Sequence, residues 1–281
     1  MSMLSAKKDV TCYRFEGGRC QVTETQAVSE TSVTLSVNGE DWLAFMCTPL
    51  ELEALAVGFM YNEGLLQSKD EIASVRVCPT GDNVDVWLTH AVTKPAQWRR
   101  TSGCTGGMTG VSTEIEPPAA NPQPSLDGVT LSPEQVTALV SQLFAVQDLY
   151  QSTGGVHTSA LSDGKRILIS AEDIGRHNTL DKIAGRCLLD GIRPRQRVLI
   201  TTGRVSSEMM QKATRIGAAV VISRTAPSSL SIEIAEKSGI TLIGYARRDR
   251  FTVYCHPQRV VASPSGEPAC TETENMLETQ V

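Results

Sequence analysis

The sequence predicts an α/β protein, α+β overall, in which a small N-terminal α+β domain precedes a larger domain with a mainly parallel sheet. Strand-like and helix-like segments alternate between residues 166 and 246, which is typical of crossover connections on a sheet with helices on both faces. A hairpin and a capped helix occupy residues 32–62. Between these two regions, Glu114–Leu126 contains four prolines and is typical of a linker.

These observations divide the chain into an N-terminal domain at residues 22–113, a Pro-rich linker at 114–127, a second domain at 128–262 and a tail at 263–281. The tail has four glutamates, no basic residue and no periodicity, so we expect it to be disordered. Residues 1–21 show little patterning, and we expect a loose arm there.

The first domain opens with a strand pair. Ser32–Val37 alternates polar and apolar side chains, Asn38-Gly39 is typical of a tight hairpin turn, and Trp42–Met46 is the return strand. Two further strands are expected at Ile72–Cys78 and Val84–Leu88.

A helix should follow the hairpin. We expect Thr48 as its N-cap, Pro49 at the first helical position and Glu51 as the partner that closes a capping box. The apolar spacing continues to about Asn62, and Gly64 ends the helix.

The second domain opens with another capping box, Ser132-Pro133-Glu134-Gln135, which starts a helix. Beyond it we expect strands at 166–170, 197–201, 219–223, 241–246 and 251–255, and helices at 178–189, 206–216 and 229–237.

Composition excludes several classes of protein. The net charge of −5 argues against general nucleic-acid binding, and no apolar run approaches the length of a membrane span. The first ten residues lack the apolar core of a signal peptide. Eight cysteines without any Cys-x-x-Cys pair favour a cytosolic protein with reduced thiols over a zinc ribbon or a disulfide scaffold.

The segment Arg99–Gly110 is the most distinctive local feature. It places Cys104 among four glycines and small hydroxyl residues, directly after Arg99 and Arg100. Glycine-rich backbone predicts an open loop, and the two guanidinium groups favour the reactive thiolate. On these residues alone, a glycine-rich linker with an incidental cysteine is an equal alternative.

Arginines follow several of the predicted strands. In an open α/β sheet, ligands bind at the carboxyl ends of the strands, where guanidinium groups could form a socket for a polyanion such as a nucleoside diphosphate. The alternative is that Arg176 pairs with Asp173 and that Arg247 and Arg248 are merely solvated. The candidates at these ends are Arg176, His177, Arg204, Arg224, Arg247, Arg248 and Arg250.

Other chemistries lack their motifs. No Walker-type glycine pattern and no Gly-x-Ser-x-Gly elbow occurs. A zinc deaminase requires His-x-Glu, but Ser159 follows His157 at the second position, and the required Pro-Cys-x-x-Cys is missing. No metal site is therefore predicted, and each histidine is more readily a hydrogen-bonded structural residue than a catalyst.

Over roughly residues 24–260 the chain resembles the formate dehydrogenase accessory sulfurtransferase family, FdhD. The longest matching run is Glu-Asp-Ile-Gly-Arg-His-Asn-x-Leu-Asp-Lys at residues 172–182. Further matching segments are Ala56–Phe59 with Glu63-Gly64, Thr101–Gly106, Thr153–His157, Gly203-Arg204 with Ser207–Met209, Leu242–Tyr245 and His256–Arg259.

The resemblance implies a second domain like that of the cytidine deaminases, without zinc. It implies that a cysteine desulfurase donates sulfur to Cys104 as a persulfide, and that the sulfur passes to the molybdenum of a bis(molybdopterin guanine dinucleotide) cofactor for formate dehydrogenase. The family's cofactor-binding segment maps onto Tyr245, Ala246, Arg247, Arg248, Asp249 and Arg250, and GDP should mimic part of the cofactor. A homodimer in the cytoplasm is also implied.

Two positions depart from the family pattern. Gly107 stands where many members have a second cysteine, and Arg247-Arg248-Asp249 replaces a familiar Lys-Pro-Gly. The first departure keeps an alternative open, a non-catalytic chaperone that binds the cofactor and delivers it without moving sulfur.

Overall fold

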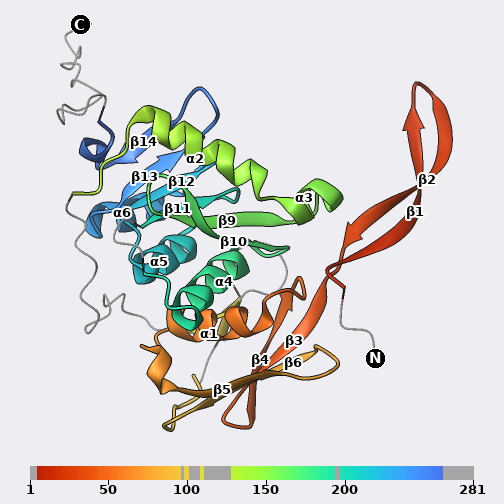
Figure 1. Cartoon of the computed structure of the whole chain (residues 1–281), viewed down its shortest axis with the longest axis vertical. Coiled ribbons are helices and arrows are strands. Elements are labelled where there is room, and N and C mark those ends of the chain that lie inside the picture. Colours follow the sequence, from red (N-terminus) through yellow and green to blue (C-terminus); the bar gives the residue numbers. More distant parts are fainter. Residues whose placement is uncertain (1–4, 96–97, 101–107, 111–127, 194–196, 262–281) are drawn as a thin grey trace, which may run out of the picture.

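The computed structural model describes residues 5–95, 98–100, 108–110, 128–193 and 197–261. Figure 1 shows a large sheet covered by helices on both faces, a smaller sheet beside it with helices packed between the two, and a two-stranded ribbon that projects away from both. Within these ranges, none of the helices has both the length and the apolar character that a membrane crossing requires.

The projecting ribbon consists of β1 (Lys7–Glu16) and β2 (Arg19–Val28), paired antiparallel from Lys7↔Val28 to Glu16↔Arg19. The expectation of a loose arm over residues 1–21 is therefore wrong from residue 7 onward. Two glycines form its tight turn, Gly17 at φ 56° and Gly18 at φ 77°, and this backbone suits the twist of a two-residue hairpin. Periodicity did not indicate the ribbon because almost every side chain in it is exposed.

The smaller sheet has the strand order β4-β3-β6-β5, with β3 (Thr31–Val37) parallel to β6 (Asn83–Leu88). The Asn38-Gly39 turn joins β3 to β4 (Glu40–Cys47) as predicted, with both residues at positive φ. A 3₁₀ turn at Lys69–Glu71 leads into β5 (Ile72–Val77). Helix α1 (Leu52–Asn62) covers one face of this sheet and shares its apolar core.

The predicted cap of α1 is wrong, although the helix ends where expected. Glu51, at φ 51°, is the N-cap residue, and no side chain caps the helix. Thr48 instead binds the second half of the chain: its amide donates to Asp173 Oδ2 (3.1 Å), and its Oγ1 accepts from the amide of Ile174 (3.1 Å). Thr48 therefore does not start the helix as its local sequence predicts, because these bonds with the second half of the chain hold it.

The large sheet has the order β10-β9-β11-β12-β13-β14. Only β11–β12 and β12–β13 are parallel pairs, so the prediction of a mainly parallel sheet is corrected to a mixed one. β9 and β10 form a hairpin that the alternation of strands and helices did not indicate, and in its turn Asp163 Oδ1 accepts from the amides of Lys165 and Arg166. The strands are β9 (His157–Ser162), β10 (Ile167–Asp173), β11 (Val198–Thr201), β12 (Val220–Ser223), β13 (Thr241–Gly244) and β14 (Thr252–Cys255).

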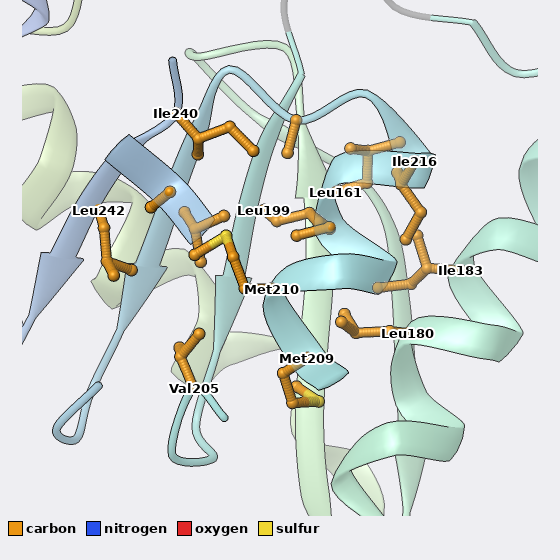
Figure 2. Packing of buried hydrophobic residues seen from close by; sticks show 14 of the residues in the cluster. Leu161, Leu180, Ile183, Leu199, Val205, Met209, Met210, Ile216, Ile240 and Leu242 are labelled. Carbon is orange, nitrogen blue, oxygen red and sulfur yellow. The ribbon is translucent and has the colours of Figure 1, made fainter. Parts of the chain in front are cut away.

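Helices cover this sheet on opposite faces, and each face has its own apolar core. On one face lies α2 (Pro133–Ala145), whose capping box between Ser132 and Gln135 is confirmed, followed by the short helix α3 (Asp148–Thr153). The other face carries α4 (Arg176–Leu189), α5 (Ser207–Ile216) and α6 (Ser229–Lys237). Figure 2 shows Leu180 and Ile183 of α4 and Met209 and Met210 of α5 packed on Leu199 and Leu242 of the sheet. A 3₁₀ turn at Pro257–Arg259 follows β14.

Helices α1 and α4 join the two parts of the molecule and cross at two glycines. A Cβ on Gly58 would lie 1.7 Å from the carbonyl oxygen of Asp181, and a Cβ on Gly185 would lie 1.9 Å from that of Ala54. No side chain fits at either position, so the two backbones touch.

Candidate functional site

The carboxyl ends of four strands meet at one edge of the large sheet. β9 is antiparallel to both β10 and β11, so β10 runs in the same direction as β11, β12 and β13. This confirms that the polar residues after these strands share an edge. The first residue of β9, His157, lies at the same edge, opposite Asp173 of β10.

A pocket of about 580 Å³ opens at this edge. The ends of the strands supply Ile174, Thr202 and Arg224, while the base of the projecting ribbon supplies Glu30. The remaining wall comes from the segment around α3. Its lining residues are Gln147, Tyr150, Gly154, Gly155, Val156 and His157. Among the described residues, the predicted segment Tyr245–Arg250 is not part of the lining.

Two histidines at this edge of the sheet have lowered pKa values. Burial, and then the charge of Arg176, lowers the pKa of His157. Burial also lowers the pKa of His177, although Glu208 opposes the shift, with Oε2 3.4 Å from His177 Nε2. A neutral imidazole can accept a hydrogen bond as well as donate one.

The structure spreads the predicted arginines over different environments. Arg176 is 4% exposed and lies against Gly203, where a Cβ would be 3.1 Å from the Cβ of Arg176. Arg204 is exposed. Arg224, another of the strand-end candidates, places its guanidinium 4.2 Å from the ring centroid of Phe144 and lines the pocket.

The predicted cofactor segment begins with a strained residue. Tyr245 has φ 50° and is 50% exposed, and a bulky residue keeps such a backbone only when its surroundings impose it. Two bonds do so, from the Tyr245 amide to the carbonyl of Thr225 (3.1 Å) and from the Ala246 amide to that of Ser223 (2.9 Å). The side chain of Ala246 is fully buried in the apolar core beneath α2.

The rest of that segment turns back on itself. The Arg247 amide donates to the carbonyl of Arg250 (2.8 Å), and its guanidinium Nη1 donates to the carbonyl of Arg224. Arg247 is therefore anchored beside the pocket instead of being merely solvated. Arg248, Asp249 and Arg250 are exposed and remain accessible.

The signature run at residues 172–182 is mostly structural. The Asp173 carboxylate lies 2.7 Å from Lys182 Nζ and accepts from the amide of Gly175 (2.7 Å) and from Asn178 Nδ2 (2.8 Å). Lys182 is therefore a buried cation paired with the Asp173 carboxylate. Farther along the helix, Asp181 pairs with Lys212 inside the core. These bonds also make α4 begin at Arg176, two residues before the predicted start.

Cys104 lies outside the described residues, as do Gly107, the Pro-rich linker at 114–127 and the tail at 263–281. The structure does describe a short strand before Cys104 and another after it. β7 (Trp98–Arg100) pairs antiparallel with β8 (Met108–Gly110), and the last pair is Arg100↔Met108. Both ends of the predicted loop at residues 99–110 are therefore strands.

The other thiols divide by burial. Burial raises the pKa of Cys47 to about 12 and that of Cys187 to about 11, and it also raises the pKa of Cys255. Such thiols stay protonated near neutral pH and are poor nucleophiles. Cys20 is exposed, on the projecting ribbon. Within the described ranges, no group of three or more His, Cys, Asp or Glu side chains is arranged to hold a metal ion.

Sequence reasoning missed most of the pocket wall. The predicted strand ends did indicate Thr202 and Arg224, since each directly follows a strand, and Gly154-Gly155 before His157 marked a turn at the same edge. Glu30 and Tyr150 carried no such signal, because only the packing of β2 and α3 against the sheet brings them there.

Comparison with known proteins connects this architecture to one family. The model of the FdhD/NarQ family matches residues 28–261. A protein named "Sulfur carrier protein FdhD" from Staphylococcus aureus strain MRSA252 is 36% identical over 252 residues, which cover 89% of this chain and 95% of its own length, and the protein of the same name from strain Newman matches equally. A crystal structure of a formate dehydrogenase accessory protein from Desulfotalea psychrophila aligns with a TM-score of 0.73 and 26% identity, over 92% of this chain and all of that one.

Proposed function

Because the chain belongs to the FdhD/NarQ family, we propose that it is a sulfur carrier that serves formate dehydrogenase. The observation that carries this proposal is the 36% identity to proteins named as sulfur carriers over nearly their whole length. The mixed sheet and its strand-end pocket support it, since a carrier needs a place where its acceptor can bind.

The sulfur-bearing residue in this proposal is Cys104. Its thiolate attacks the terminal sulfur of a cysteine desulfurase persulfide, so that a new S–S bond forms on Cys104 while the desulfurase cysteine leaves as a thiolate. The raised pKa values of Cys47, Cys187 and Cys255 support this choice, because those thiols are poor nucleophiles. The exchange takes place in the cytoplasm, where thiols stay reduced.

The proposed acceptor is molybdenum bis(molybdopterin guanine dinucleotide), a substrate whose diphosphates bind at the strand-end edge. Arg224 in the pocket and the exposed Arg204, Arg248 and Arg250 supply positive charge at that edge. Guanidinium groups bind phosphate oxygens through paired hydrogen bonds. The segment Tyr245–Arg250 lies beside the pocket, because Arg247 donates a hydrogen bond to the carbonyl of Arg224. We propose that this segment and the pocket together bind the nucleotide portion of the cofactor.

Two experiments test the proposal. After incubation with a desulfurase and cysteine, intact mass should show an adduct of about 32 Da on the wild-type protein and none on Cys104→Ala. Cys20→Ala removes an exposed cysteine elsewhere and should keep the adduct.

Calorimetry should show GDP binding that Arg250→Ala weakens by about 1.5–3 kcal/mol. Arg166→Ala, at the opposite end of β10, should bind GDP like the wild type.

Gly107 supports one competing function. Gly107 stands where a Cys-x-x-Cys pair would have its second cysteine, which argues against a mechanism with two neighbouring thiols. A chaperone that only delivers the cofactor needs no thiol. GDP binding without any sulfur adduct would favour that chaperone. We propose that either function is carried out by a homodimer.

A further inference from the structure

The pocket wall formed by residues 147–157 depends on a helix that is too short to be stable by itself. This segment supplies six of the lining residues named above, and before His157, the first residue of β9, its only regular element is α3, with six residues. Helices of this length are not stable in isolation, so contacts with other elements must hold this one.

The start of α3 has no cap of its own. Gln147 occupies the N-cap position without a capping side-chain bond, and its Nε2 donates instead to Thr158 Oγ1 (2.9 Å). The free amides of the first turn therefore need another acceptor, since unpaired amides at a helix start are costly when water is excluded.

The carboxylate of Glu172 is that acceptor. Its Oε2 accepts from the amide of Leu149 (2.7 Å) and its Oε1 from that of Tyr150 (2.9 Å). Both bonds are charge-assisted, and the carboxylate lies at the positive end of the helix dipole.

Glu172 is itself fixed by the sheet. It lies on β10 directly opposite Thr158 of β9, and Thr158 Oγ1 donates to its Oε1 (3.4 Å). Its own carbonyl accepts from the buried Lys182 Nζ (3.1 Å). The carboxylate that caps the short helix α3 is therefore held in place by the sheet. Glu172 itself does not line the pocket.

We infer that Glu172 is a positioning residue, which clamps α3 to the sheet and so keeps Tyr150 and the turn at Gly154 in place around the pocket. The inference rests on the proposed function, because it assumes that this pocket binds the nucleotide portion of the acceptor. It concerns a residue that acts only through the wall and contacts no ligand.

The test compares Glu172→Gln with Asp148→Asn. Glutamine keeps the shape of Glu172 but loses the charge and one of the two acceptor oxygens. Asp148 is an exposed acid in the first turn of the same helix, so Asp148→Asn removes an equal charge without touching the clamp. GDP is the probe for calorimetry, and amide hydrogen exchange follows Leu149 and Tyr150.

We expect Glu172→Gln to weaken GDP binding by about tenfold and to speed exchange at Leu149 and Tyr150, while the global unfolding midpoint stays near that of the wild type. Asp148→Asn should leave affinity and exchange unchanged. If the wild type binds GDP and Glu172→Gln binds it equally well, the inference is overturned and the proposed function stands. If the wild type binds no GDP, the proposed ligand is wrong, and exchange alone then decides: unchanged exchange in Glu172→Gln overturns the clamp, and faster exchange supports it.

Discussion

His177 follows β10 at the start of α4 and is 3% exposed. Its Nε2 lies 3.4 Å from both Glu208 Oε2 and Ser206 Oγ, so the side chain contacts the first turn of α5. Burial lowers its pKa even with a carboxylate beside it, which means that protonation is unfavourable in the folded protein. This residue links the stability of the site to pH.

Stability should therefore fall as the pH falls below about 6.5, the ordinary pKa of histidine, because the unfolded chain then binds a proton that folded His177 resists. The same contribution is fully present above that pH. We expect His177→Gln to lose less stability than the wild type between pH 7.5 and 5.5, measured by thermal unfolding.

His90→Asn, which changes an exposed imidazole, should retain the wild-type pH dependence. An equal loss of stability in the wild type and His177→Gln would contradict the prediction, although His157 contributes in the same direction in both proteins.

At the scale of elements, the contact between α1 and α4 is the least tolerant part of the fold. Gly58 and Gly185 bring the two backbones together, and the atoms that a Cβ would meet at both positions belong to main chain. A flexible side chain could move aside, but a carbonyl in the middle of a helix cannot do so without moving the helix.

We expect Gly185→Ala to destabilise the protein by roughly 1–3 kcal/mol in urea unfolding. In an ordinary helix interior the same change is stabilising by up to about 1 kcal/mol, so the sign itself tests the packing. Ser141→Ala, on the exposed side of α2, is the control and should stay within about 0.5 kcal/mol of the wild type. A more stable Gly185→Ala variant would show that the helices do not touch as described.

At the scale of the whole molecule, two buried ion pairs connect the halves of the chain. Lys182 Nζ lies 2.7 Å from Asp173 Oδ2 and 3.2 Å from the carbonyl of Thr48. Asp181 lies 2.5 Å from Lys212 and accepts from Asn62 Nδ2 (2.7 Å). Because Thr48 and Asn62 precede the predicted linker and the charged residues follow it, neither half can unfold without exposing or breaking these bonds.

We therefore expect the two predicted domains to unfold in a single transition. All three tryptophans, Trp42, Trp87 and Trp98, lie before the linker, so fluorescence reports the N-terminal half while far-UV circular dichroism reports the whole chain. The two urea transitions should coincide. Separate midpoints would show that the halves are independent.

Lys182→Met should lower the free energy of unfolding by about 3–5 kcal/mol, because it leaves the Asp173 carboxylate buried without its cation. The midpoints of both urea transitions should shift together. Lys165→Met, at an exposed turn, is the control. A shift confined to one of the two signals would contradict the coupling.

The sequence by itself determined the features that local chemistry specifies. The capping box at Ser132, the Asn38-Gly39 turn and the end of α1 near Asn62 depend on neighbours in the chain, and the structure has them where they were expected. The meeting of the strand ends followed from the alternation of strands and helices, and the run at residues 172–182 indicated the family to which the chain belongs. The role of Cys104 stays a prediction.

Tertiary structure alone decided the rest, because it depends on residues far apart in the sequence. Strand direction within the large sheet follows from the β9–β10 hairpin, which an expectation of regular crossovers overlooked. Thr48 does not cap α1, and its amide instead donates to Asp173, more than a hundred residues away. The reason is that a buried carboxylate must be satisfied by hydrogen-bond donors. The pocket likewise joins Glu30, Tyr150 and Arg224, which only the packing of a ribbon, a short helix and a strand end brings together.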